Sequence, residues 1–176
     1  MTRLGLFVAL FTVLLTNTPT VEAKEGPIYA LGGEVYCTGN ECGVGLAFER
    51  LHRGLEVDVF LKAGVYDPIG HPDQLWPTNG LGVRLLWVVG EGSFRFLYGG
   101  FVAASVNQDF KTVDIQPQLG MVYRLGDDKE RLQARFKILG GGGMTVGFER
   151  WNDDDTQVIG EWNVVATVSI PFSAGP

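Results

Sequence analysis

Apolar residues alternate with polar or small residues through most of this chain. Between positions 55 and 65 one face of the alternation carries Leu55, Val57, Val59, Leu61, Ala63 and Val65, and the other carries Glu56, Asp58, Phe60, Lys62 and Gly64. Successive side chains of a β-strand point to opposite faces, so this period of two predicts a strand with two chemically different sides. The same pattern predicts eight strands in all, near residues 28–37, 42–49, 55–65, 80–90, 94–104, 113–125, 131–149 and 157–172.

Two of these segments contain residues that disturb a strand. The glycines from Gly140 to Gly143 could form a turn that divides segment 131–149 into a hairpin. The apolar residues stay on even positions on both sides of the glycines, however, and a two-residue turn would reverse that parity. We therefore predict one long strand with a flexible or bulged middle. Pro117 cannot donate a hydrogen bond to a neighbouring strand, so we expect a local bulge there.

The first 23 residues have the features of a secretory signal peptide. Arg3 supplies a positive charge, Leu4 to Leu15 are apolar, and Val21 and Ala23 place small residues at the −3 and −1 positions of a cleavage site. We expect cleavage after Ala23, with residues 24–176 forming a single β-barrel domain. No later apolar run reaches the roughly 18 to 20 residues of a membrane-spanning helix, which excludes a helical membrane protein.

Composition narrows the class further. Removing Arg3 and Glu22 with the signal takes the 14 basic and 20 acidic residues to 13 and 19, a net charge of −6. An acidic chain without a basic cluster argues against a nucleic-acid partner. The mature chain keeps 24 of the 25 glycines, about twice the usual share, which argues against long helices.

Cys37 and Cys42 are the only two cysteines, and the residues between them are turn-forming. In the oxidising compartment that an exported protein reaches, they could close a small loop through a disulfide bond. Two free thiols are the alternative. A structural zinc site would need two further ligands that this pair does not supply.

A closed sheet of eight such strands could lie in a membrane with its apolar face outward, or in water with its apolar face inward, as in lipocalin-like binding barrels. Small residues on the polar face favour the first arrangement, because the interior of an eight-stranded barrel is just wide enough for side chains. These residues are Gly32, Gly45, Ala47, Gly64, Gly82, Gly99, Ala103 and Gly120.

Charged residues of both signs occupy the same face in equal numbers. Equal numbers suit a closed network of ion pairs in the lumen, since an unpaired buried charge is unfavourable. The six acids are Glu34, Glu49, Glu56, Asp58, Asp114 and Glu161, and the six bases are Lys62, Arg84, Arg95, Arg124, Arg135 and Lys137.

Aromatic residues gather where the predicted strands end. Two such belts match the two lipid interfaces of a membrane barrel. At the end with the shorter turns they are Tyr29, Phe48, Trp87, Phe94, Tyr123 and Phe172, and near the longer loops they are Tyr66, Trp76, Phe110, Phe148 and Trp151. The connections support this polarity, because the tight links 50–54, 91–93 and 126–130 alternate with 38–41, 66–79, 105–112 and 150–156. The core of a soluble barrel is the alternative explanation of the aromatic residues.

The run from Val164 to Phe172 resembles the last strand of the small eight-stranded outer-membrane barrels, the group of the OmpA membrane domain and OmpX. In that family the final aromatic residue is read by the barrel assembly machinery, although here Ser173 to Pro176 follow Phe172. The resemblance implies an all-β, eight-stranded antiparallel up-and-down transmembrane β-barrel. It also implies an outer-membrane location in a Gram-negative-type bacterium, in contact with membrane lipid and lipopolysaccharide.

Two classes of function fit such a barrel. The first is a structural or surface-interaction protein with a side-chain-filled lumen, which uses loops 66–79 and 150–156 for envelope integrity, adhesion or binding of an extracellular protein. The second is a narrow pore or a transporter of a small apolar ligand. The charged lumen favours the first class.

A lipid-modifying enzyme is a third possibility with less support. His52 and His71 are the only histidines, and neither has a serine two residues away, the pattern expected of a barrel that deacylates lipid. His71 with Asp73 could orient a general base, but a solvated loop is the favoured interpretation. We expect no cofactor. A phosphate-binding loop at Gly140 to Gly143 is disfavoured, because no Lys-Ser/Thr pair follows and no helix is predicted to start there. A cation at Asp153 to Asp155 is less favoured than a solvated charge run.

Overall fold

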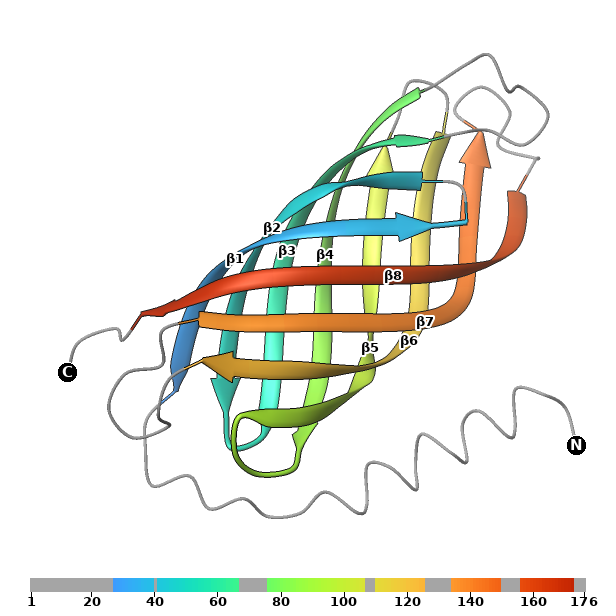
Figure 1. Cartoon of the computed structure of the whole chain (residues 1–176). Helices are drawn as coiled ribbons and strands as arrows, with labels where there is room; N and C mark the ends of the chain where they lie inside the picture. The colour runs from blue at the N-terminus through green and yellow to red at the C-terminus, as the bar shows by residue number, and fades with distance from the viewer. Residues whose placement is uncertain are drawn as a thin grey trace, which may run out of the picture.

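A computed structural model describes residues 27–39, 41–66, 76–106, 110–125, 134–149 and 156–172. These residues form eight antiparallel strands, in which β8 pairs with β1 and closes the sheet into a barrel (Figure 1). The strands are β1 (Ile28–Thr38), β2 (Glu41–His52), β3 (Leu55–Tyr66), β4 (Trp76–Val89), β5 (Phe94–Val106), β6 (Phe110–Leu125), β7 (Ala134–Glu149) and β8 (Thr156–Phe172). The predicted all-β, up-and-down barrel is confirmed. No helix in the described part of the chain is long and apolar enough to cross a membrane.

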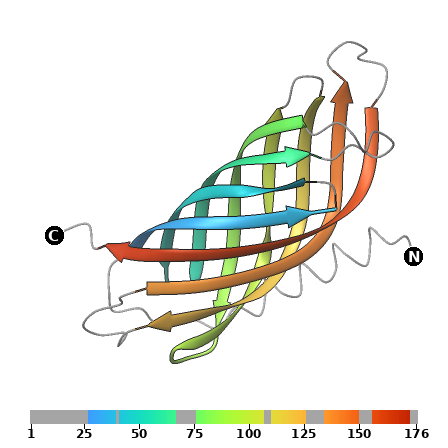
Figure 2. The same ribbon diagram turned by 45° about the horizontal axis from the view of Figure 1, so that its top comes forward.

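The strands are staggered as they go round the barrel. A path that steps from each residue to its partner on the next strand starts at Ile28 and returns to β1 at Thr38, ten residues further along. The path runs through Ile28, Leu51, Glu56, Leu86, Gly99, Gln118, Gly141, Asn163 and Thr38. Closure of a barrel requires such a stagger, and it tilts the strands against the axis, which gives them the oblique course visible in Figure 2. The stagger also decides which side chains meet across the lumen.

Burial alternates along the strands as the period of two predicts. On β4, Arg84 is 1% exposed, whereas its neighbours Val83 and Leu85 are 45% and 44% exposed. On β1, Glu34 is buried and Val35 is exposed. The polar and small face therefore lines the lumen, and the apolar face lies outside. This is the reverse of a lipocalin-like barrel, so that alternative is wrong.

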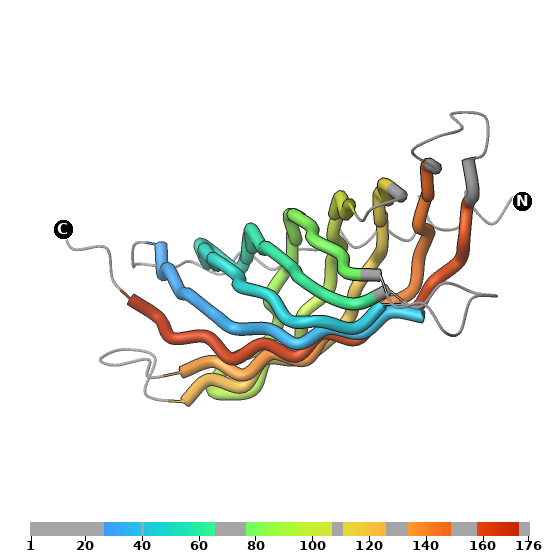
Figure 3. The backbone as a smooth tube through the Cα atoms, turned by 90° about the horizontal axis from the view of Figure 1, so that it is seen from above, coloured from blue at the N-terminus to red at the C-terminus, as the bar shows by residue number. Residues whose placement is uncertain are grey.

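β7 runs as one strand through Gly140 to Gly143, as predicted. The bulge expected at Pro117 is wrong, because Ile115 pairs with Met144 and Gln118 with Gly141 in one unbroken register. Residues 116 and 117 lack a pair on β7, but no extra residue is inserted. A Cβ atom on Gly141 would collide with the Pro117 carbonyl oxygen, so β6 and β7 approach each other closely at this point. Figures 1 and 3 show the bend in β7.

Two chemically different ends can be distinguished. At the end that we call the turn end, β2 and β3 are joined by Arg53 and Gly54, which both have positive φ, 50° and 78°. The carbonyl of Gly54 accepts a hydrogen bond from the Val88 amide, 2.8 Å long, which ties this turn to β4. The opposite end, which we call the disulfide end, carries Cys37 and Cys42.

Inward-facing glycines occupy positions where neighbouring strands approach closely. A Cβ atom on Gly99 would collide with the carbonyl oxygen of Leu85, and one on Gly120 with that of Ile138. Outward-facing Gly33 differs, because a Cβ atom there would meet nothing within 4 Å. Backbone approach in the lumen wall therefore explains part of the high glycine content.

We expect Gly99→Ala to destabilise the barrel by about 1 to 3 kcal/mol, because β4 and β5 must separate to admit the methyl group. Gly33→Ala is the matched control and should change stability by less than about 0.5 kcal/mol. Urea unfolding of the refolded protein in detergent micelles measures both. Equal stability of the two variants would contradict the close approach of β4 and β5.

Candidate functional site: the charged lumen

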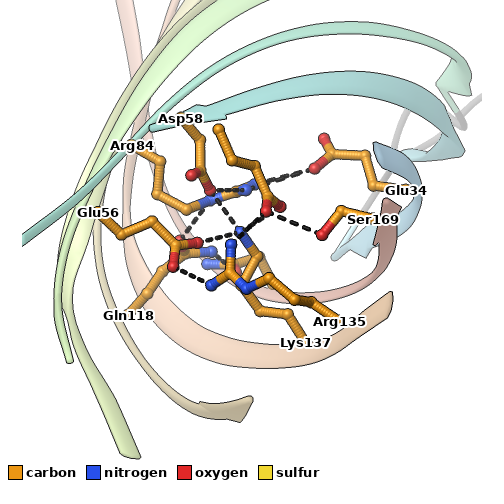
Figure 4. A network of polar contacts seen from close by, with 10 residues as sticks. Glu34, Glu56, Asp58, Arg84, Gln118, Arg135, Lys137 and Ser169 are labelled. Atoms are coloured by element: carbon orange, nitrogen blue, oxygen red, sulfur yellow. Dashed lines mark hydrogen bonds and ion pairs between the residues drawn. The ribbon is translucent and has the colours of Figure 1, made fainter. Parts of the chain in front are cut away.

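Ion pairs fill the lumen in three groups, which we name by position: a lower cluster toward the turn end, a central cluster and an upper cluster toward the disulfide end. Each arises because the inward positions of several strands carry complementary charges, and closure of the sheet brings strands distant in sequence to face one another. Figure 4 shows the lower and central clusters together.

The lower cluster is organised around Lys137 of β7. Its Nζ lies 2.8 Å from Oε1 of Glu49, 2.6 Å from Oε1 of Glu56 and 2.6 Å from Oδ2 of Asp58. Neither the lysine nor any of these carboxylates is more than 1% exposed. One ammonium group therefore contacts acids from both β2 and β3.

Arg135, two residues before Lys137 on the same face of β7, contacts two of the same acids. Its Nη1 lies 2.6 Å from Oε2 of Glu49, and Nη2 pairs with Glu56. The hydroxyl of Ser169 on β8 donates a further hydrogen bond to Glu49, 2.9 Å long. Side chains of β7 and β8 are thus linked across the lumen to acids of β2 and β3.

The central cluster is built on Arg84 of β4. Its Nη1 donates to Oδ2 of Asp58 at 3.0 Å and to Oε2 of Glu34 at 3.3 Å, and its Nε donates to Oε1 of Gln118 at 3.0 Å. The guanidinium lies 4.7 Å from the centre of the Phe60 ring. The side-chain amide of Gln118 donates in turn to Oδ1 of Asn163, and Nδ2 of Asn163 donates to Oε1 of Gln116. Asp58 joins this cluster to the lower one.

The upper cluster contains Lys62, whose Nζ lies 3.0 Å from Oε2 of Glu41 and 3.4 Å from Oδ2 of Asp114. The Tyr36 hydroxyl donates to Glu41 at 2.7 Å, and Thr78 also donates to it. A second threonine, Thr145 of β7, donates to Asp114 at 2.7 Å, and its hydroxyl oxygen also lies 3.1 Å from Oε2 of Glu161. Hydroxyl groups thus supplement a single lysine at this end.

Apolar side chains fill the space beside the charges. They form two buried groups. The smaller contains Ala47, Phe60 and Ala103. The larger, in which partly buried Leu51 also packs, contains Tyr36, Leu86, Val88, Leu97, Val122, Leu139 and Val165. Most come from β4 to β7, whereas the acids of the lower cluster come from β2 and β3. Ion pairs are screened little beside apolar groups, so each charge depends on its partner.

The acids of the lower cluster also satisfy a simple geometric requirement for a metal ion. One oxygen from each of Glu49, Glu56 and Asp58 lies within 4.8 Å of the others. Lys137 contacts all three residues, and Arg135 contacts two of them. The protein's own cations therefore occupy the position that a metal would take.

Two of the twelve charges predicted for the lumen lie outside the three clusters. Arg124 is buried near the turn end, and Arg95 is more exposed there, with its Nε donating to the Gly92 carbonyl at 3.1 Å. Conversely, Glu41 was not predicted, because the sequence places it in a connection between two strands. β2 begins at Glu41. Glu41 and the inward-facing Gly45 are four residues apart, so a strand extended back to Glu41 would have placed this side chain in the lumen.

Cys37 and Cys42 are paired residues of β1 and β2 and are joined by a disulfide bond. The bond closes the β1–β2 hairpin beside the upper cluster. Among the described residues no cysteine is free.

The aromatic residues predicted at the shorter turns lie on the outer surface of the turn end. Tyr29, Phe48 and Phe172 contact one another with ring centres 5.9 to 6.3 Å apart, and Phe94 contacts Tyr123. Trp87 stacks on Tyr98. At the disulfide end Phe148 is exposed. Trp151 and the side chains of Tyr66, Trp76 and Phe110 lie outside the described part of the structure, as does most of each loop proposed to bind partners.

The structure is similar to the crystal structure of Neisserial surface protein A, with a TM-score of 0.58 and 8% sequence identity over 84% of this chain and 100% of that chain. The fold is that of a small outer-membrane barrel. Weaker matches, each over 84% of this chain and 100% of the other, are the N-terminal β-barrel domain of Pseudomonas aeruginosa OprF (TM-score 0.43, 12% identity) and a major outer membrane protein from Thermus thermophilus (0.44, 11%). No family model and no curated protein matches the sequence.

Replacing Arg84 by Met should destabilise the barrel by about 3 to 5 kcal/mol, because Glu34 loses the cation that it contacts in the lumen. Lys111→Met removes an exposed positive charge and should change stability by less than about 0.5 kcal/mol. Denaturant unfolding in micelles compares the two variants. Similar small losses in both would show that Arg84 is not part of a buried network.

Loss of the disulfide should have a smaller effect, about 1 to 2 kcal/mol in a Cys37→Ser, Cys42→Ser double variant, because the closed loop is short. Mass spectrometry of the unreduced native protein should find neither thiol available for alkylation. Alkylation of both cysteines would contradict the bond.

Proposed function

We propose that the protein spans the outer membrane as a closed barrel that does not conduct ions, with a structural or surface-interaction role. The main support for this proposal is that the barrel has an apolar outer surface and a lumen in which charged side chains form ion pairs.

The outer surface supports the membrane location. Leucine, isoleucine and valine side chains are exposed on successive strands, with Leu46 60%, Leu81 54%, Leu119 67% and Ile170 66% exposed. Apolar patches larger than a few hundred Å² are rare on proteins surrounded by water. Charges on the outward positions of the described strands are confined to Arg50 and Lys111, which lie near opposite ends of the barrel. The apolar band between them suits the hydrocarbon region of a bilayer.

The lumen supports a closed rather than a conducting barrel. An ion in transit would need water-filled space or polar groups free to replace its water, but Lys137 and Arg84 each bind more than one acid within the lumen. Phe60, Leu86 and Leu139 are buried and occupy further space in the lumen. A transporter of a small apolar ligand would need apolar lumen residues that are free to contact the ligand. In this lumen the buried apolar side chains pack against one another.

The orientation completes the proposal. We place the disulfide end outside the cell, where residues 67–75 and 150–155 connect strands, and the turn end toward the periplasm. The connecting segments would serve adhesion, envelope integrity or binding of an extracellular protein, and the barrel assembly machinery would insert the chain after removal of residues 1–23.

The membrane location predicts that the mature protein sediments with outer membranes, needs detergent to dissolve, and changes its apparent size on a gel when boiled. Recovery of a monomer from detergent-free periplasmic extract would contradict it.

In a planar bilayer, the inserted protein should show no steady ion-conducting steps, because its lumen charges are paired. An Arg84→Ser, Lys137→Ser variant that still shifts on boiling is the comparison, since small polar side chains open the centre of the lumen. Stable, reproducible conductance by the unmutated protein would replace the structural role with that of a pore.

A further inference from the structure

The outward face near the turn end carries a group of basic residues, which we call the rim patch: Arg50, His52 and Arg53. Arg50 and His52 are two residues apart on β2, so both lie on the outward face, and Arg53 follows in the turn to β3. Both arginines are exposed. Within the described ranges of the chain neither arginine forms an ion pair, so both guanidinium groups are available to a ligand.

Arg53 has a backbone conformation that does not suit its side chain. Its φ of 50° lies in the left-handed region, and Gly54 follows with a φ of 78°. Two-residue turns of this kind favour Asn or Gly at the first position, because other side chains are strained there. A long cationic side chain at a strained turn position points to a use that a smaller residue would not serve.

The surroundings of the rim patch are aromatic. Arg50 pairs directly with Tyr29 of β1, which contacts the rings of Phe48 and Phe172. On the other side, Leu55, the pairing partner of His52, is also paired with Trp87, which stacks on Tyr98 with ring centres 5.7 Å apart. Tyrosine and tryptophan rings favour the headgroup region of a bilayer. The rim patch therefore lies at the level where lipid phosphates are found.

We propose that Arg50 and Arg53 bind the phosphodiester of an anionic glycerophospholipid in the leaflet at the turn end. Guanidinium groups match phosphate oxygens in charge and geometry, and two unpaired positive charges favour a lipid with net negative charge over a zwitterionic one. A protein partner fits less well, because the residues beside the patch belong to the apolar outer face. This inference rests on the proposed membrane location.

Native mass spectrometry tests the proposal. The intact mature barrel is refolded in detergent, exposed to equal amounts of phosphatidylglycerol and phosphatidylcholine, and the retained lipids are counted. We expect preferential retention of phosphatidylglycerol. An Arg50→Gln, Arg53→Asn variant should bind it about thirtyfold more weakly, as each arginine near a lipid surface contributes about fivefold. Asn at position 53 suits the turn, so the variant should still fold.

Lys111→Gln is the matched control, because it removes the one outward charge described at the opposite rim, and it should retain phosphatidylglycerol like the unmutated protein. Inorganic phosphate in excess should not displace the lipid. Equal retention of the two lipids, unchanged retention in the double variant, equal loss in the control, or displacement by phosphate would each overturn the proposal.

The gel shift on boiling separates this inference from the proposed function. A barrel that inserts into phosphatidylcholine vesicles and shifts on boiling, but shows no preference among lipids, loses only the rim-patch site. A chain that fails to enter any bilayer contradicts the membrane location itself, and the lipid site with it.

Discussion

Closure of the sheet with a stagger of ten residues is the constraint on which the rest of the molecule depends. A closed sheet has no free edge, so its backbone polar groups can be satisfied within the barrel even in lipid. It also commits every strand residue to the lumen or to the outside. A slip of one residue would exchange Arg84 with Leu85, placing a charge on the apolar outer face and a leucine among the acids. The period-two sequence and the closed register therefore require each other.

The lumen charges contribute more to selecting one strand register than to the free energy of folding. Buried ion pairs lose hydration as they gain attraction, so apolar side chains of the same volume would serve stability as well. Apolar packing, however, tolerates small displacements between strands. The pairs do not, because Arg135 and Glu49 are 86 residues apart in sequence, and Lys137 and Glu56 are 81. They meet only if every intervening strand has its correct neighbour and stagger.

The fold could be predicted from the sequence because apolar residues repeat with period two along every strand. Even the long strand through Gly140 to Gly143 could be predicted, because the apolar residues on both sides of the glycines occupy even positions. Predictions from the residue types at single positions were less accurate at Pro117 and at Glu41. At Pro117 the register continues without an inserted residue, and the facing part of β7 consists of the glycines 140–143. Glu41 lies in the lumen because β2 starts earlier than its turn-forming neighbours indicate.

Which charges pair could not be predicted from the sequence. The inward positions of the acids and bases can be read from parity, but their partners depend on the stagger accumulated over eight strands. Shifting the β8–β1 contact by two residues would preserve every inward position and give Glu34 other neighbours. The backbone strain at Arg53 could not be predicted either, because it depends on the positive φ that this residue adopts in the two-residue turn.

The most direct measurement of the account is the contact of individual methyl groups with lipid. NMR of the methyl-labelled protein in bicelles, with through-space transfer from lipid acyl chains, compares Leu85 with its neighbour Leu86. We expect strong transfer to Leu85 and to other outward methyls such as those of Leu81, and none to Leu86 or Leu97. Transfer to Leu86 and Leu97 in place of Leu81 and Leu85 would mean that the apolar face lines the interior, and would contradict a membrane barrel with a charged lumen.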